Sequence, residues 1–291
     1  MLKNRQQRAI TITFGSTAEN GPGMEHVTAA GAVGKAGAGD GLTCEDIQCI
    51  KDRCDAQGMK TRLISLDAGL IGNGELHKRA EQAHLLVVED MIEGLGRVRP
   101  EVLFEELTKD SVHWDAQALM RGQVKNKLAR HNICISDYAQ TADYQAGKGT
   151  VVAFEDLPTL KVIRENLGRL HPKLENLPAE GNDYFDARQC GIGFHGDAER
   201  PLTVGMRLYG SEEAKIQFHY QWYQNSKPVG RRMSIDLPNG SGYFMCEKAT
   251  GFDWKKTANG RLTLRHAAAG SGKKTKRFLR PEEIEGEILC L

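Results

Sequence analysis

The sequence of 291 residues carries 39 basic and 38 acidic side chains, a formal net charge of +1, and 40% hydrophobic residues. This is the composition of an ordinary globular protein, and its balanced charge argues against a protein held on nucleic acid mainly by bulk electrostatics. No apolar run approaches the roughly 18 residues that a membrane-spanning helix needs, and the basic N-terminus lacks an apolar signal core. We therefore expect a cytoplasmic protein, or a nuclear one in a eukaryotic cell.

The first hundred residues predict an α/β region. A helix should run from Thr43 to about Gln57, because Thr43 and Asp46 have the spacing of a capping box. Alternating or apolar runs predict strands at 8–14, 61–68 and 84–90. We treat residues 1–100 as an N-terminal region of unknown role and residues 101–291 as the second domain.

The second part begins with helical patterns and ends with short strands. Helices are predicted at 101–122 and 157–170, with mixed structure between them. After residue 180, short strands alternate with turns, and the predicted strands are 202–210, 215–224, 231–237, 242–248, 261–268 and 273–279. This spacing is typical of an antiparallel sandwich or barrel, so the whole chain is predicted to be an α+β protein.

Seven cysteines are present, an odd number without the spacing of a disulfide framework. Cys44, Cys49 and Cys54 recur on the first predicted helix at an interval that spreads them around it, so they cannot converge on one metal ion. We expect reduced thiols, as in a reducing compartment.

The most informative segment is 182–200, which contains His195-Gly196-Asp197. Positions i and i+2 share one face of a strand, so this pair can chelate one ion together with a histidine from a distant strand. Two histidines and one carboxylate form the facial triad that holds non-haem Fe(II) with coordination positions left open. A second such pair, His113 and Asp115, lies in the predicted helix 101–122, where the two side chains would diverge.

Only two histidines follow this motif in the sequence, and His266 is the better third ligand. It ends an alternating run with Leu262 and Leu264, whereas His219 lies in an aromatic segment and is predicted to be a packed histidine. Arg277 lies one predicted strand beyond His266, where its guanidinium would grip the far carboxylate of a dicarboxylate such as 2-oxoglutarate.

With these residues, the sequence resembles the AlkB family of Fe(II)/2-oxoglutarate dioxygenases over about residues 120–280. The likeness rests on the run from His195 to Arg200, on Asn182-Asp183-Tyr184, on 234–256 and, more loosely, on 125–144. In the last of these segments Ala129 stands where relatives have proline before Arg130. The resemblance implies a double-stranded β-helix (jelly roll) core with flanking helices, to which the N-terminal α/β region is an extension.

The resemblance also implies the role of each site residue. Fe(II) would be bound by His195, Asp197 and His266, and O2 and 2-oxoglutarate would be co-substrates. Asn182, Tyr184 and Arg277 would bind 2-oxoglutarate, whereas Glu199 and Arg130 would contact the substrate.

Three functions remain open at this point. The first is hydroxylation or oxidative demethylation of a modified nucleobase in nucleic acid, in which Glu199 would contact the base. The second is hydroxylation of a protein side chain or a small molecule, favoured by the near-neutral charge. The third is a catalytically silent binding module that has kept the fold.

Overall fold

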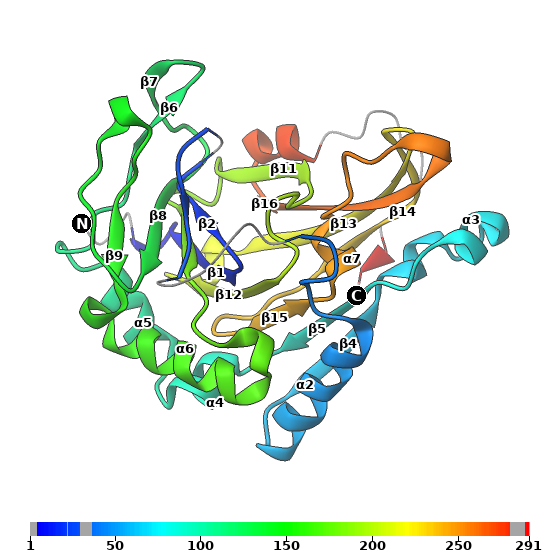
Figure 1. Ribbon diagram of the computed structural model, residues 1–291, viewed down its shortest axis with the longest axis horizontal. Coiled ribbons are helices and arrows are strands. Elements are labelled where there is room, and N and C mark those ends of the chain that lie inside the picture. Colours follow the sequence, from blue (N-terminus) through cyan, green and yellow to red (C-terminus); the bar gives the residue numbers. More distant parts are fainter. Residues whose placement is uncertain (1–4, 22, 30–36, 280–288, 291) are drawn as a thin grey trace.

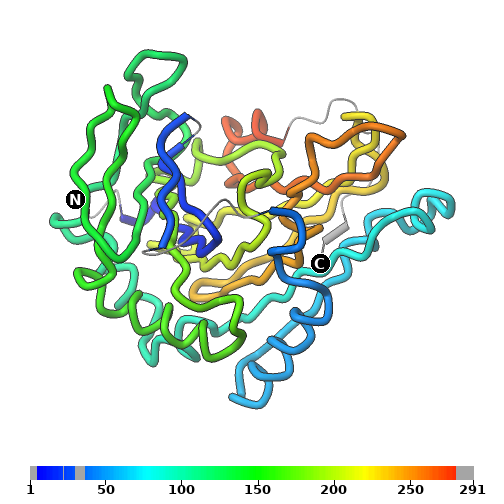
Figure 2. Tube along the Cα trace, in the orientation of Figure 1, coloured from blue at the N-terminus to red at the C-terminus, as the bar shows by residue number. Residues whose placement is uncertain are grey.

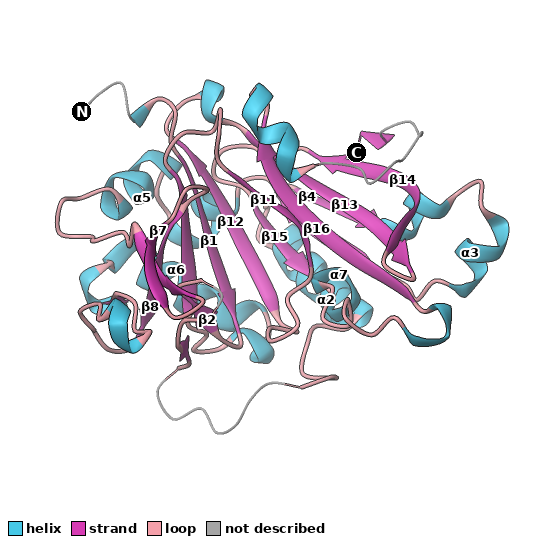
Figure 3. Ribbon diagram, turned by 90° about the horizontal axis from the view of Figure 1, so that it is seen from above, coloured by secondary structure: helices cyan, strands magenta, loops and turns pink. Residues whose placement is uncertain are grey.

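The computed structural model describes residues 5–21, 23–29, 37–279 and 289–290, and it is a mixed α+β structure (Figure 1). Two antiparallel sheets dominate it, and their strands run through the middle of the molecule with helices around them (Figure 3). Their facing sides are in contact, because the rings of Phe218 and Tyr243, one from each sheet, stack with centroids 5.0 Å apart. Buried apolar side chains from both sheets and from the helices form one continuous core.

The larger sheet has eight strands. In spatial order they are β4 (Thr61–Ser65), β5 (His84–Val88), β15 (Gly242–Met245), β12 (Thr203–Tyr209), β1 (Ala9–Gly15), β10 (Ala179–Tyr184), β8 (His131–Ser136) and β9 (Val151–Ala153). All neighbours are antiparallel except β8 and β9.

The smaller sheet has five strands, in the order β11 (Gly191–His195), β16 (Leu262–Gly270), β13 (Ile216–Gln224), β14 (Lys227–Ile235) and β17 (Leu289–Cys290). Two further pairs form short two-stranded sheets: β2 (Ala18–Glu19) with β3 (His26–Val27), and β6 (Gln117–Met120) with β7 (Gln123–Asn126). The strands of residues 180–270 confirm the predicted series of short antiparallel strands.

The first strand of the chain lies in the interior of the larger sheet. β1 pairs with β10 on one side and with β12 on the other, both antiparallel. In Figure 2 the N-terminal strand, in blue, accordingly runs among the yellow-green strands of residues 179–209. β4 and β5 belong to the same sheet, so the boundary predicted near residue 100 separates neither two sheets nor two cores.

Six α-helices lie in the described part of the chain: α2 (Cys44–Ala56), α3 (Gly74–Arg79), α4 (Met91–Gly96), α5 (Pro100–Leu107), α6 (Pro158–Leu170) and α7 (Glu247–Thr250). The predicted capping box of α2 is confirmed, because the Thr43 hydroxyl accepts the Asp46 N–H and the Asp46 carboxylate accepts the Thr43 N–H. The amphipathic helix predicted at 157–170 is α6. Among the described residues, no helix is both long enough and apolar enough to cross a membrane.

The helix predicted at 101–122 is wrong beyond its first turns. α5 ends at Leu107, where the Thr108 hydroxyl donates to the Phe104 carbonyl oxygen at 2.8 Å and competes with the helical pattern. Asp115 is then fully buried, accepting hydrogen bonds from the backbone and hydroxyl of Thr150, both at 2.7 Å. These tertiary contacts override the local helical preference.

The strand predicted at 273–279 is also wrong. The segment forms a 3-10 helix, η7 (Lys273–Phe278), in which the Thr275 hydroxyl donates to the backbone oxygens of Gly270 and Gly272. The segment lacks the apolar alternation of the other strands, so a hydroxyl bonding back to the chain decides its conformation. Arg277 therefore does not lie on a strand beside His266.

Candidate metal centre and cavity

His195 and His266 are brought together by the pairing of two strands. His195 ends β11 and is directly opposite His266 on β16, with ring centroids 4.4 Å apart. A register shift between Ile192 and His195 accompanies this pairing. Asp197 follows in the turn after β11, and its N–H donates to the Thr250 carbonyl oxygen at 2.9 Å, at the end of α7. One strand pair and one turn thus place all three side chains.

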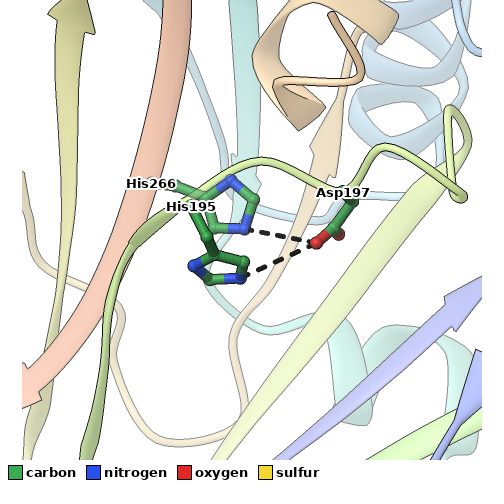
Figure 4. A group of neighbouring side chains, drawn as sticks. All are labelled: His195, Asp197 and His266. Carbon is green, nitrogen blue, oxygen red and sulfur yellow. Dashed lines mark ion pairs between the residues drawn. The ribbon is translucent and has the colours of Figure 1, made fainter. Parts of the chain in front are cut away.

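The three side chains form a group that could hold a metal ion. One donor atom from each lies within 4.8 Å of the other two, and no other such group occurs in the part of the chain that the structure describes. Asp197 Oδ1 lies 3.7 Å from His195 Nε2 and 3.9 Å from His266 Nε2 (Figure 4). The sequence-predicted triad is therefore assembled in space, although the geometry does not identify the ion.

Protonation also suits metal binding. Burial lowers the pKa of His195, and burial together with the neighbouring His195 lowers that of His266 to about 3. Burial alone would raise the pKa of Asp197, but Arg200 and the two histidines outweigh it, so the net shift is downward. Neutral imidazoles and an ionised carboxylate are the forms that bind metal ions. His195 Nδ1 lies 2.8 Å from the Gly193 carbonyl oxygen, so a proton on Nδ1 leaves Nε2 free to coordinate.

Arg200 holds the carboxylate ligand in place. Its guanidinium lies between two acids, with Nη2 3.3 Å from Asp197 Oδ2 and Nη1 2.8 Å from Glu180 Oε2. Asp197 thus presents one oxygen to the histidines and the other to Arg200. Glu180 in turn accepts from Asn182 Nδ2 at 2.8 Å, and Asn182 Oδ1 accepts from Arg130 Nε at 2.5 Å.

The triad opens into a cavity of about 140 Å³ between the two sheets. Besides the triad, its wall includes Asn182 and Tyr184 from β10, and Arg130, all three of which the sequence assigned to the site. A cavity of this size is far larger than the roughly 10–15 Å³ that one water molecule requires. It is therefore large enough to admit a small organic molecule.

Arg207 is the residue that sequence reasoning missed. It lies on β12 opposite Thr11 of β1, lines the cavity and is only 1% exposed. Its Nε and Nη1 atoms, like the Thr11 hydroxyl, have no hydrogen-bond partner among the described residues. A buried guanidinium without a partner is costly, which marks this end of the cavity as suited to an anion. The signal in the sequence was an arginine between the apolar Met206 and Leu208.

Arg277 lies elsewhere. Its Nη2 donates to the Gln189 carbonyl oxygen at 3.4 Å in an exposed setting, and its guanidinium lies over the Phe278 ring at 4.8 Å. It does not line the cavity. The cation that the sequence analysis expected from Arg277 is thus provided in this cavity by Arg207, because residues 273–278 turn instead of extending along the sheet.

The remaining candidates are placed as follows. His219 is buried, and its Nδ1 lies 2.7 Å from the Ser234 hydroxyl, which confirms it as a packed histidine. His113 is largely exposed whereas Asp115 is buried, and the pair belongs to no metal-binding group among the described residues. The sequence excluded this pair because a helix was expected there, but the structure has no helix at these positions.

A second, larger cavity of about 500 Å³ meets the first at the metal centre. The two share Glu19, His195, Asp197 and Arg200. Glu199 lies on the wall of the larger cavity and pairs with Lys255 at 3.7 Å. The metal centre thus borders both cavities.

Comparison with known proteins gives one informative match. The chain is 40% identical over 262 residues to an uncharacterized protein of Acanthamoeba polyphaga mimivirus, which covers 90% of this chain and 95% of the viral protein. The chain belongs to the same family as that viral protein. No model of a described protein family matches the chain.

Proposed function

We propose that the protein is an AlkB-like Fe(II)/2-oxoglutarate-dependent dioxygenase. The observation that carries the proposal is that a His-Asp-His group and a buried arginine with two unpaired nitrogen atoms line the same cavity. The triad has the donor set of a facial non-haem iron site. Arg207 has the charge and planar geometry to bind a carboxylate with two parallel hydrogen bonds.

The order of the strands supports a jelly-roll core for this site. From β10 to β16, strands alternate between the larger and smaller sheets, with only β13 and β14 consecutive in one sheet. Four strands of the larger sheet, β15-β12-β1-β10, would face β11-β16-β13-β14 of the smaller sheet. A jelly roll has eight strands in two sheets. We propose that β1 fills the eighth place, which would otherwise fall to a strand following β16.

The co-substrate would lie between the triad and Arg207. Arg207 and Thr11 would bind the far carboxylate of 2-oxoglutarate, which would satisfy the unpaired donors of the buried guanidinium. Tyr184 lies beside them, with its ring 5.9 Å from the Arg207 guanidinium. Arg130 and Asn182 would act as positioning residues, because their hydrogen bonds lead through Glu180 to Arg200 and Asp197.

Bound iron would supply the activation of O2 that hydroxylation of an unreactive C–H bond requires. The chain contributes geometry and exclusion of water. Gly193 sets the tautomer of His195, Arg200 orients Asp197, and the cavity between the two sheets would remove much of the co-substrate from bulk solvent.

The substrate would enter through the larger cavity, and we propose a modified nucleobase as its class. Glu199 supports this proposal, because it faces that cavity beside the metal ligands and a carboxylate can accept a hydrogen bond from an exocyclic amine. Hydroxylation of a protein side chain or a small molecule is the alternative, and a screen of methylated oligonucleotides, nucleosides and peptides for product formation separates the two.

The reaction class is tested by Fe(II)- and O2-dependent conversion of 2-oxoglutarate to succinate. His266→Ala should abolish conversion, whereas His219→Asn, a change in a buried histidine outside the cavity, should retain it. Absence of succinate from the iron-loaded wild-type protein with every candidate substrate would refute the proposal and leave a binding module.

A further inference from the structure

Cys44 and Cys246 meet on the side of the molecule where α2 begins. Leu42 forms a bridge with Cys246, and the Glu247 N–H donates to the Leu42 carbonyl oxygen at 2.7 Å, so the two segments are held together. Cys44 lies at the first position of α2, two residues beyond Leu42, and the sulfur atoms of Cys44 and Cys246 both contact the backbone of residues 82–84. Both are free thiols, Cys246 buried and Cys44 partly exposed.

The surroundings favour the thiolate form of Cys246. The His84 N–H donates to Cys246 Sγ at 3.1 Å, whereas Cys44 Sγ donates to the Gln82 carbonyl oxygen at 3.9 Å. The neighbouring Cys44 side chain, followed by backbone N–H groups, lowers the pKa of Cys246 to about 7 against the effect of burial. By contrast, burial raises the pKa of Cys54 to about 12 and that of Cys190 to about 11, so those thiols are unreactive.

A structural metal site does not explain this pair. Zinc sites need further ligands, and among the described residues no third histidine, cysteine, aspartate or glutamate completes a metal-binding group with the two cysteines. Two neighbouring thiols instead can form a disulfide, whose S–S bond length is about 2.05 Å.

The pair is connected to the metal centre through α7. Cys246 caps the start of this helix, and Met245, its neighbour in the sequence, lines the cavity between the two sheets. At the other end of α7, the Thr250 carbonyl oxygen accepts the N–H of Asp197. Moving Cys246 Sγ from the His84 N–H toward Cys44 would displace this short helix, and closely packed interiors transmit such strain.

We propose that Cys44 and Cys246 are a redox couple that hydrogen peroxide converts to a disulfide, and that the disulfide weakens metal binding by His195, Asp197 and His266. The Cys246 thiolate attacks one peroxide oxygen, the O–O bond breaks, and hydroxide leaves and takes up a proton to become water. Cys44 then attacks the sulfenic sulfur, and its proton leaves with the sulfenic hydroxyl as a second water. Two thiols are oxidised and one peroxide is reduced. The proposal requires only the metal centre and is independent of the dioxygenase reaction.

The chemistry is tested on the full chain, treated with equimolar hydrogen peroxide, blocked with an alkylating reagent and digested without reduction. Cleavage after glutamate separates Cys44 from Cys49, because Glu45 lies between them. A peptide linking Cys44 to Cys246 is expected from the wild-type protein and from the matched control Cys49→Ser, but not from Cys44→Ser. Recovery of both wild-type cysteines in alkylated form would overturn the proposed couple.

The coupling is tested by titrating Mn(II) into the reduced and the oxidised protein. Oxidation should weaken binding by about 2- to 30-fold, the usual range for coupled sites, and reduction with dithiothreitol should restore it. Peroxide should leave Mn(II) binding by Cys44→Ser unchanged. Equal affinities of the reduced and disulfide forms would overturn the coupling while leaving the proposed dioxygenase activity untouched.

Discussion

Thr11 and Arg207 are directly opposite each other across β1 and β12, both line the cavity at the metal centre, and both have buried polar atoms without a hydrogen-bond partner among the described residues. Residues far apart in the sequence thus meet in the wall of the cavity that the triad also lines. This pairing decides which arginine we assign to the co-substrate.

Replacing Arg207 by methionine should abolish tight binding of 2-oxoglutarate to the Mn(II)-loaded protein. Loss of a bidentate, charge-assisted contact costs about 2–4 kcal/mol, a roughly 30- to 1000-fold rise in the dissociation constant. The same variant without ligand should be at least as stable as the wild type in urea unfolding, because an unpaired buried charge is removed. Arg277→Met is the matched control, and equal losses of affinity in the two variants would contradict the assignment.

Arg200→Met should destabilise the fold by about 3–5 kcal/mol, because it leaves two buried carboxylates without their cation. Adding Glu180→Gln should recover part of the loss, since one of those charges is then removed. Urea unfolding of the wild type, both single variants and the double variant measures this coupling. Strict additivity would show that Arg200 and Glu180 do not act as a pair.

Gly196→Ala should weaken Mn(II) binding by about 10- to 100-fold, as expected when the support of a ligand is disturbed. A Cβ at this position would lie 2.2 Å from the Gly251 carbonyl oxygen and 2.6 Å from a Trp254 ring carbon, so the turn that presents Asp197 must move. Gly193→Ala meets nothing closer than 3.4 Å and serves as the control. Unchanged metal affinity in Gly196→Ala would show that the turn is tolerant.

The metal-free protein should lose stability as the pH falls below 6.5. Burial lowers the pKa of His219 to about 4, so between pH 6.5 and 4 the unfolded chain binds the proton that the folded chain excludes. The stabilisation is therefore complete above pH 6.5, and each such histidine removes at most about 1.4 kcal/mol per pH unit below it. His219→Asn should reduce the slope of unfolding free energy against pH, and an unchanged slope would exclude this contribution.

The metal triad could be predicted because its signals are local. Alternation with Leu262 and Leu264 marks the inward side of β16 and so predicts His266, because this signal depends only on the period of a strand. The sequence selects His195 and Asp197 because positions i and i+2 share one face of a strand, but β11 ends at His195, and Asp197 is placed by the turn that follows.

Arg207 could not be assigned in the same way, because its meaning depends on which strands pair with β12. The sequence shows an arginine in an apolar strand, but only the pairing with β1 shows that it faces a chamber shared with the triad. The co-substrate role predicted for Arg277 depended on a local feature, a strand at 273–279. The structure has a 3-10 helix there, because the Thr275 hydroxyl donates to the Gly272 carbonyl oxygen.

The interior position of β1 has a consequence for how the chain folds. β1 precedes its partners β10 and β12 by more than a hundred and sixty residues, so it has no neighbours to join until the strands at 179–209 exist. Such long-range pairing carries a large loop-closure cost and is slow. During synthesis, the backbone N–H and C=O groups of β1 remain unpaired until those strands form, and an unpaired apolar strand is prone to aggregate. We therefore expect chaperone dependence during biosynthesis, and we expect the pocket for the carboxylate to mature after the helices and the later strands have already formed.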